Sequence, residues 1–269
     1  MPIIDLHSHS RYSDGVVGIS ELVYTYKKAS VEMMSLTDHD CILGLEEARY
    51  KAEKDNILFV NGVEISTRDY ENLHFVGYNF DPKNSALLKL LESNAALRLE
   101  RVRKTIKLLR ENGVDITEEE VIKLTKGVPS RAHVADVLRR KKLGVTRADI
   151  FKNYLGKGCF AYVPPLAATV KETIEIIRQA GGKCFIAHPG LVKEYWSFKQ
   201  WVSWGLDGIE VFYPSHREAL REELLQIAKT YNLLVSGGSD FHGNIAGRTL
   251  VPGREVPQEV YDKLYSVFF

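Results

Sequence analysis

The chain has 269 residues, which suits one large α/β domain or a barrel that carries an insertion, and it is long enough to bury a full core. Hydrophobic residues make up 45% of it and charged residues 26%, as in soluble globular proteins, and no apolar run approaches the roughly 18 residues of a membrane span. Three scattered cysteines without a CxxC pair, and a start without a leader-like segment, predict a cytoplasmic protein with no thiolate zinc site and no membrane association.

The first 82 residues alternate between apolar runs and helical patterns. Predicted strands lie at 3–6, 33–36, 57–60 and 75–78, and predicted helices lie at about 20–29 and 43–54. Each strand adjoins histidine or carboxylate side chains, beginning with His7 and His9, which project the same way as the first strand ends. Alternation of this kind predicts a parallel α/β architecture.

The alternation stops between residues 83 and 157. Apolar residues at helical spacing over 87–109, and three helix starts at Thr117, Pro129 and Thr146, predict a helical insertion. This segment contains 18 Lys or Arg and 9 Asp or Glu, a local charge of +9, so the rest of the chain carries −8 within the total of +1. A basic segment beside an acidic body favours a domain that covers the substrate and attracts anions.

The alternation resumes after residue 157, so residues 1–82 and 158–269 are predicted to form one barrel domain. Predicted strands lie at 161–163, 183–187, 208–213 and 233–236, and predicted helices lie at about 170–180, 196–204, 218–231 and 258–269. His188 follows one of these strands, and Asp240 and His242 follow another. The second half of the chain thus repeats the pattern of polar residues at strand ends.

These strand-end residues are the strongest functional signal in the sequence. Because parallel barrels carry their reactive residues on the loops after the carboxyl ends of the strands, nine side chains are expected to gather at one face: His7, His9, Asp14, His39, Glu64, His74, His188, Asp240 and His242. No Ser, Cys or Lys recurs among them, whereas a nucleophilic triad would need one activated hydroxyl or thiol. Imidazole with carboxylate suits zinc, manganese or iron, and nine ligands exceed the needs of one catalytic zinc. The sequence therefore predicts two to three divalent metal ions.

This pattern resembles the PHP family, named for polymerase and histidinol phosphatase domains. The matching motifs are His7-Ser8-His9, Thr37-Asp38-His39, Gly62-Val63-Glu64, His74, His188-Pro189 and Asp240-Phe241-His242. The resemblance implies an α/β fold, a distorted (β/α)7 barrel with a three-metal site. By position it assigns one ion to His7, His9, Glu64 and Asp240, a second to Glu64, His74 and His188, and a third to Asp14, His39 and His242.

Within this family the chain looks most similar to stand-alone phosphoesterases with a helical insertion. That subgroup includes 3′,5′-nucleotide bisphosphate phosphatases and 5′-to-3′ exoribonucleases of short RNA. The similar stretches are 129–133, 154–158 and 161–164. The resemblance implies hydrolysis of phosphate esters of nucleotides or short RNA by a metal-activated hydroxide, and no obligate protein partner is evident.

Roles for individual residues follow from these expectations. Glu64 and Asp240 are the expected catalytic ligands, and His216 is the spare imidazole near the face for protonation of the leaving group. Arg131 is the first choice for binding a phosphate, because its planar guanidinium matches phosphate oxygens. Further candidates for substrate binding are His133, Arg248 and Lys157.

Three alternatives stay open. A histidinol-phosphatase-like enzyme of the same family would act on a smaller substrate than the basic insertion favours. An amidohydrolase-type C–N hydrolase also begins with His-x-His, but such sites commonly bridge their metals with a modified lysine where Glu64 stands here. A non-catalytic nucleotide- or RNA-binding module would leave many buried polar groups without a use, which is costly.

Overall fold

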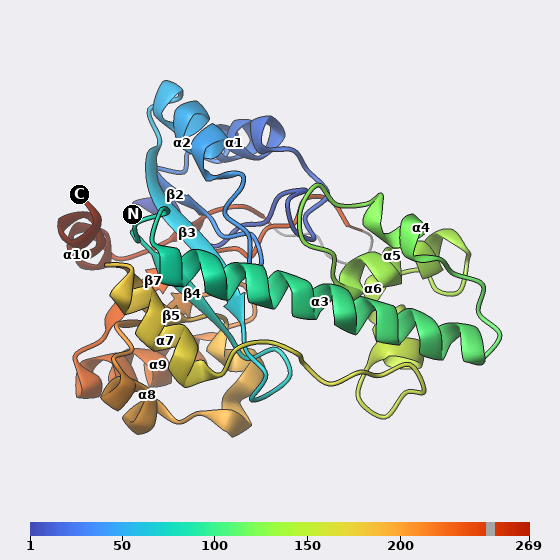
Figure 1. The fold of residues 1–269 in the computed structure, drawn as a ribbon. Helices are drawn as coiled ribbons and strands as arrows, with labels where there is room; N and C mark the ends of the chain where they lie inside the picture. The colour runs from blue at the N-terminus through green and yellow to red at the C-terminus, as the bar shows by residue number, and fades with distance from the viewer. Residues whose placement is uncertain (246–250) are drawn as a thin grey trace.

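The computed structural model describes residues 1–245 and 251–269 and has a mixed sheet of eight strands at its centre (Figure 1). The strands are β1 (Ile3–Asp5), β2 (Met33–Leu36), β3 (Leu58–Ser66), β4 (His74–Tyr78), β5 (Lys183–Ile186), β6 (Gly208–Phe212), β7 (Leu234–Gly237) and β8 (Arg254–Glu255). Their order is β7-β6-β5-β4-β3-β2-β1-β8. Backbone hydrogen bonds from Leu6 to Gly237 (3.0 Å) and from Asp240 to His7 (2.9 Å) join the segments at β1 and β7, so the sheet closes nearly into a barrel. The predicted α/β barrel is confirmed.

Strand direction differs from the prediction at β4. Four neighbouring pairs of the sheet are parallel, but β4 is antiparallel to both β3 and β5. The loop from β3 to β4 is too short for the crossover helix that a parallel pair needs, whereas an antiparallel pair needs only a short turn. As a result His74, the first residue of β4, lies beside Ser66 at the carboxyl end of β3.

Helices cover the barrel on opposite sides (Figure 1). On one side lie α1 (Ile19–Lys28) and α2 (Leu45–Lys54), and on the other lie α7 (Val170–Gln179), α8 (Phe198–Trp204) and α9 (Glu218–Tyr231). The last helix, α10 (Gln258–Phe268), lies at the end of the barrel beside the two chain termini. A short helix, η2 (Pro189–Tyr195), follows β5. The buried faces of these helices supply apolar side chains to the core, such as Leu22, Ile174 and Leu224.

The insertion is built on α3 (Ser85–Glu111), whose 27 residues span about 40 Å. Its amino-terminal half packs on the barrel and its carboxyl-terminal half extends away from it (Figure 1). There it joins α4 (Glu118–Ile122), α5 (Arg131–Arg140), α6 (Arg147–Ile150) and η1 (Phe151–Leu155) around a separate apolar cluster that includes Val102, Val134 and Ile150. The boundaries at residues 83 and 157 remain a prediction.

Local sequence signals account for most of these elements, and one predicted element is wrong. Thr117 and Thr146 cap their helices as predicted, and Ser130 caps α5 just after Pro129. The predicted strand at 161–163 is wrong, because these residues bond to the insertion instead of to a strand: Ala161 donates to the Tyr154 carbonyl and the Val163 carbonyl accepts from Arg101. Among the described residues, no helix has the length and apolarity that a bilayer crossing requires.

Candidate metal centre

All nine strand-end residues meet at one end of the barrel, around the buried carboxylate of Glu64. Its two oxygens lie within ion-pair distance of five imidazoles, at 3.3 Å from His7 Nε2, 3.1 Å from His9 Nε2, 3.1 Å from His39 Nδ1, 2.8 Å from His74 Nδ1 and 3.0 Å from His188 Nε2. Glu64 lies in β3, and these histidines come from β4 and from the segments after β1, β2 and β5. Residues far apart in the sequence thus share one carboxylate.

Two aspartates complete the cluster on either side of His242. Asp14 Oδ1 lies 3.2 Å from His242 Nε2 and 3.7 Å from His9 Nδ1. Asp240 Oδ1 lies 3.4 Å from His242 Nδ1 and 3.2 Å from His9 Nε2. His9 therefore lies between both aspartates and Glu64, at the middle of the cluster.

The strand ends adopt unusual backbone conformations to bring these side chains inward. His188 has φ of 30° and Asp240 has φ of 53°, the left-handed region that non-glycine residues rarely adopt. Gly238 allows the end of β7 to approach β1, because a Cβ there would lie 2.3 Å from the Cβ of His7. Strain of this kind is typical of functional sites, where the surrounding fold holds it in place.

Further polar residues hold the cluster from outside. Glu210, buried in β6, has one oxygen 3.0 Å from His7 Nδ1 and accepts a 2.6 Å hydrogen bond from the His188 backbone at the other. The Tyr213 hydroxyl donates to Asp240 Oδ2 at 3.0 Å. A carboxylate behind a metal-binding imidazole orients the ring and makes it a better ligand. The prediction from sequence missed Glu210, although a lone carboxylate within the apolar run 208–212 is a signal that could have found it.

Charges in the cluster compensate one another strongly. Burial disfavours the charged form of His9, but the carboxylates of Asp240 and Glu64 raise its pKa to about 9. Burial likewise opposes ionisation of Glu64, yet His39 and His7, with other neighbouring imidazoles, hold the pKa of that carboxyl well below its usual range. The centre is therefore built for ionised carboxylates that face positive charge.

Several buried ligand atoms have no hydrogen-bond partner that would offset the free-energy cost of removing them from water. Within the described part of the chain, His7 Nε2, His9 Nε2, His39 Nδ1, Asp14 Oδ1 and Glu64 Oε2 form no hydrogen bond. Burying such atoms unsatisfied costs about 1–3 kcal/mol each. Four overlapping trios of donor atoms lie within 4.8 Å of one another, and imidazole nitrogen with carboxylate oxygen is the donor set of zinc, manganese and iron. The residues present therefore fit divalent metal ions.

These trios only partly follow the predicted ligand sets. His7, His9 and Asp240 form one trio, as expected for the first ion, and His7 joins Glu64 and His188 in another. The third trio is His9, Asp14 and His242, and the fourth is His9, His39 and Glu64. The division of the nine ligands among individual ions stays a prediction.

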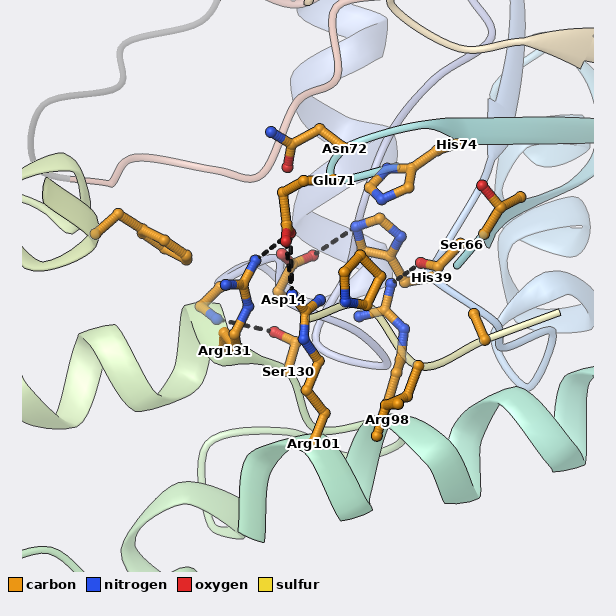
Figure 2. Close-up of a pocket in the computed structure, with 16 residues that line it drawn as sticks. Asp14, His39, Ser66, Glu71, Asn72, His74, Arg98, Arg101, Ser130 and Arg131 are labelled. Atoms are coloured by element: carbon orange, nitrogen blue, oxygen red, sulfur yellow. Dashed lines mark hydrogen bonds and ion pairs between the residues drawn. The ribbon is translucent and has the colours of Figure 1, made fainter. Parts of the chain in front are cut away.

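Two adjoining cavities open beside the cluster and share Asp14, His39 and His74. We call the first the arginine cavity, because Arg98, Arg101 and Arg131 line it (Figure 2). The second, the metal cavity, exposes ligands such as His188 and Asp240 and is bordered by Phe151 and Leu191. Since the two are continuous, a ligand can contact the metal centre and the arginines at once.

Within the arginine cavity, two guanidinium groups converge on Glu71 (Figure 2). Arg101 Nη2 donates to Glu71 Oε2 at 2.8 Å, and Arg131 Nη2 donates to Glu71 Oε1. The Tyr162 hydroxyl donates to Oε2 at 3.1 Å, and Arg98 pairs with the buried Asp40 at 2.6 Å. Arg131 thus lines a cavity beside the metal centre, and its predicted phosphate contact stays a prediction. Arg98, Arg101 and Glu71 carry no sequence signal that separates them from ordinary surface charges.

Three other predicted substrate or acid residues are described by the structure, and none of them lines either cavity. His133 is buried and its Nδ1 accepts from the Ser130 backbone, as part of the α5 cap, and Lys157 is exposed. His216 donates from Nδ1 to the Val211 carbonyl at 2.9 Å and accepts at Nε2 from Gly190 at 3.1 Å. This tautomer leaves no proton on Nε2 for a leaving group. Arg248 lies outside the described residues.

Fold and site together define a metal-dependent hydrolase, and comparison with known proteins narrows the class. The PHP domain matches residues 5–161. A 5′-3′ exoribonuclease of Haemophilus influenzae is 36% identical over 247 residues, 88% of this chain and 89% of that protein. A 3′,5′-nucleoside bisphosphate phosphatase of Chromobacterium violaceum is 33% identical over 252 residues, 90% of this chain and 88% of that protein.

Solved structures agree with this result. An amidohydrolase from Chromobacterium violaceum, crystallised with sulfate and without metal, is 31% identical with a TM-score of 0.87, over 98% of this chain and 96% of that one. A Bifidobacterium adolescentis protein described as a metal-dependent phosphoesterase is 28% identical with a TM-score of 0.86, over 97% and 95% of the two chains. The chain belongs to the PHP family, and it is a metal-dependent phosphoesterase.

Proposed function

We propose that this enzyme hydrolyses phosphate esters of nucleotides or of short RNA at the 5′ end, as a 3′,5′-nucleoside bisphosphate phosphatase or a 5′-to-3′ exoribonuclease. The observation that carries this proposal is the continuity of the metal centre with the arginine cavity. A substrate with two phosphates would place one at the metals and the other at the arginines. The names of the two curated relatives support the same pair of activities.

The metal ions would be held by the nine ligands around Glu64. When bound, they supply Lewis acidity towards phosphoryl oxygens and lower the pKa of water. The protein's own part is to fix the ligands: Glu210 orients His7, and the Tyr213 hydroxyl holds Asp240 through Oδ2, the oxygen that does not pair with the imidazoles. Metal identity stays open among manganese, zinc and iron, which all accept these donors.

The phosphate that is not cleaved would bind Arg131 and Arg101. Both guanidinium groups, with the Tyr162 hydroxyl, already surround one anion, the Glu71 carboxylate. A phosphate presents the same negative oxygens in a larger group, and arginine binds such groups through paired hydrogen bonds. The substrate would therefore displace Glu71, and Phe151, which borders both cavities, would lie beside the nucleoside.

The site gives less support to the alternatives. One related structure is described as an amidohydrolase, but Glu64 occupies the centre of this cluster and no lysine lines either cavity among the described residues. A histidinol-phosphatase-like activity would leave the arginine cavity without a ligand.

All three cysteines are free, which supports the predicted reducing cytoplasm.

The test is to assay the purified enzyme with manganese, zinc or iron on three substrates. These are a 3′,5′-nucleoside bisphosphate, the matching 5′-monophosphate and a 5′-phosphorylated octaribonucleotide. We expect release of phosphate or shortening of the RNA from the first and third, slower turnover of the second, and no activity in EDTA. Turnover of neither the bisphosphate nor the RNA, with metal shown to be bound, would rule the proposed function out.

A further inference from the structure

A third cavity is lined by residues on both sides of Asp14 in the chain, Arg11 and Gly15, and shares Arg147 with the metal cavity. We call it the basic groove, and the charged side chains that line it are Arg11, Lys123, Lys126, Asp136, Arg140 and Arg147. They come from the loop after β1, from the α4–α5 connection, from α5 and from α6, so four parts of the chain bring positive charge to one place. No Phe, Tyr or Trp lines it among the described residues.

Four of these cations have no ion-pair partner among the described residues. Arg147 pairs with Asp136 at 2.6 Å, but within the described chain Arg11, Lys123, Lys126 and Arg140 are exposed and form no ion pair. Several other cations of the insertion have carboxylate partners, as in the pairs Arg103–Glu118, Lys104–Glu100 and Lys141–Glu120. Five cations beside the single lining carboxylate of Asp136 give the groove an excess of positive charge, which favours an anionic ligand.

The groove is tied directly to the metal centre. Arg147 lines both the groove and the metal cavity, and its Nη2 donates to the Asp14 backbone carbonyl at 3.1 Å. The groove floor is the loop that carries Asp14, and Lys126 donates from its backbone to Arg11 at 2.7 Å to join the insertion to that loop. A polyanion that leaves the metal cavity over Arg147 therefore passes into the groove.

We propose that the basic groove binds the backbone phosphates of single-stranded RNA downstream of the nucleotide at the metal centre. This inference rests on the proposed function and specifies its substrate as a chain rather than a mononucleotide. Lysine and arginine bind phosphates without regard to sequence, and a groove that no Phe, Tyr or Trp lines among the described residues lacks the large rings on which bases stack. The groove should therefore make the affinity for RNA depend on the length of the chain and not on the identity of its bases.

The experiment uses the triple variant Lys123→Ala/Lys126→Ala/Arg140→Ala in the metal-loaded enzyme. For a 5′-phosphorylated octaribonucleotide we expect kcat/KM to fall at least tenfold near 0.1 M salt, while kcat/KM for the 3′,5′-bisphosphate changes less than twofold. The slope of log(kcat/KM) against log[salt] for RNA should become shallower by about 2, as three lost phosphate contacts require. The matched control is Lys89→Ala/Lys199→Ala/Lys229→Ala, which removes the same charge from exposed sites elsewhere and should change neither substrate.

A second readout separates the groove from catalysis. Fluorescence anisotropy of a labelled octaribonucleotide in EDTA measures binding without hydrolysis, and the groove variant should bind at least tenfold more weakly than the control variant. Equal losses on RNA and bisphosphate, or no loss on RNA, would overturn the inference. So would a groove that binds anionic vesicles or an acidic peptide in preference to RNA. If the wild type binds RNA through the groove but does not cleave it, the proposed function fails and the groove stands.

Discussion

The barrel rim and the helical insertion use charge in opposite ways. At the rim, Glu64, Asp14 and Asp240 are buried, and each faces several imidazoles at 2.8–4.0 Å, so the cluster is compact and compensated. In the insertion, cations line open cavities: Arg101 and Arg131 share the carboxylate of Glu71, and four cations of the basic groove form no ion pair within the described chain. The rim is built to hold small cations permanently, and the insertion is built to exchange anions with solvent.

The largest expected effect is at the rim. Glu64→Gln removes the charge that five imidazoles share, so we expect loss of bound metal and a fall in kcat of at least 1000-fold. The matched control is Glu210→Gln. Glu210 contacts the metal ligand His7 and not the metals themselves, so loss of its charge should weaken metal affinity by about 10–100-fold. Elemental analysis and phosphate release check both, and a Glu64→Gln enzyme with full metal content would contradict the role of the carboxylate.

In the insertion the effect should fall on substrate binding alone. Arg131→Ala removes a charge-assisted contact worth about 1.5–3 kcal/mol, so KM should rise by about 10–100-fold while metal content stays unchanged. Arg139→Ala is the control, since it lies in the same helix but bonds to Asp136 and to the Val145 carbonyl. Loss of metal from the Arg131 variant would mean that this side chain supports the metal centre instead.

A smaller, opposite effect is expected at Glu71. Glu71→Gln keeps the shape of the side chain but removes its charge, so Arg101 and Arg131 should bind phosphate more readily. We expect inorganic phosphate to inhibit this variant several-fold more strongly, with Glu92→Gln, an exposed position of α3, as the control. Weaker inhibition by phosphate would show that Glu71 helps to position the arginines rather than competing with the substrate.

The smallest effect concerns pH and the metal-free protein. The pKa of His9 is raised to about 9 from 6.5, so protonated His9 stabilises the metal-free fold fully below pH 6.5, and this contribution is lost as the pH rises through 9. A metal ion binds only the deprotonated ring of His9, so metal affinity rises over the same pH range. The difference in Tm between metal-loaded and metal-free protein should therefore grow by a few degrees from pH 6.5 to 9. A difference that shrinks over this range would contradict the assignment of His9 to the cluster.

Much of the rim could be predicted because its signals are local in the sequence. His7, Glu64 and Asp240 each adjoin an apolar strand, and the carboxyl ends of parallel strands meet at one edge. His74 fits less simply, since it begins a strand, and only the antiparallel direction of β4 brings it to the rim.

The insertion was harder to predict because its contacts join distant residues. Nothing in a basic helix separates Arg101 from its neighbours until Glu71 lies opposite it. His216 had the right residue type near the right edge, but its two backbone contacts, to Gly190 in η2 and to Val211 in β6, depend on tertiary structure. Charge balance alone identified the insertion as basic, but it could not show which cations are free.

The most direct test of the central claim is anomalous diffraction from crystals soaked in manganese. The account predicts two or three peaks within ligand distance of the cluster, at least one of them bound to Glu64, with Arg101 and Arg131 free of metal. Peaks elsewhere, or none at Glu64 in crystals whose enzyme hydrolyses phosphate esters in solution, would contradict it.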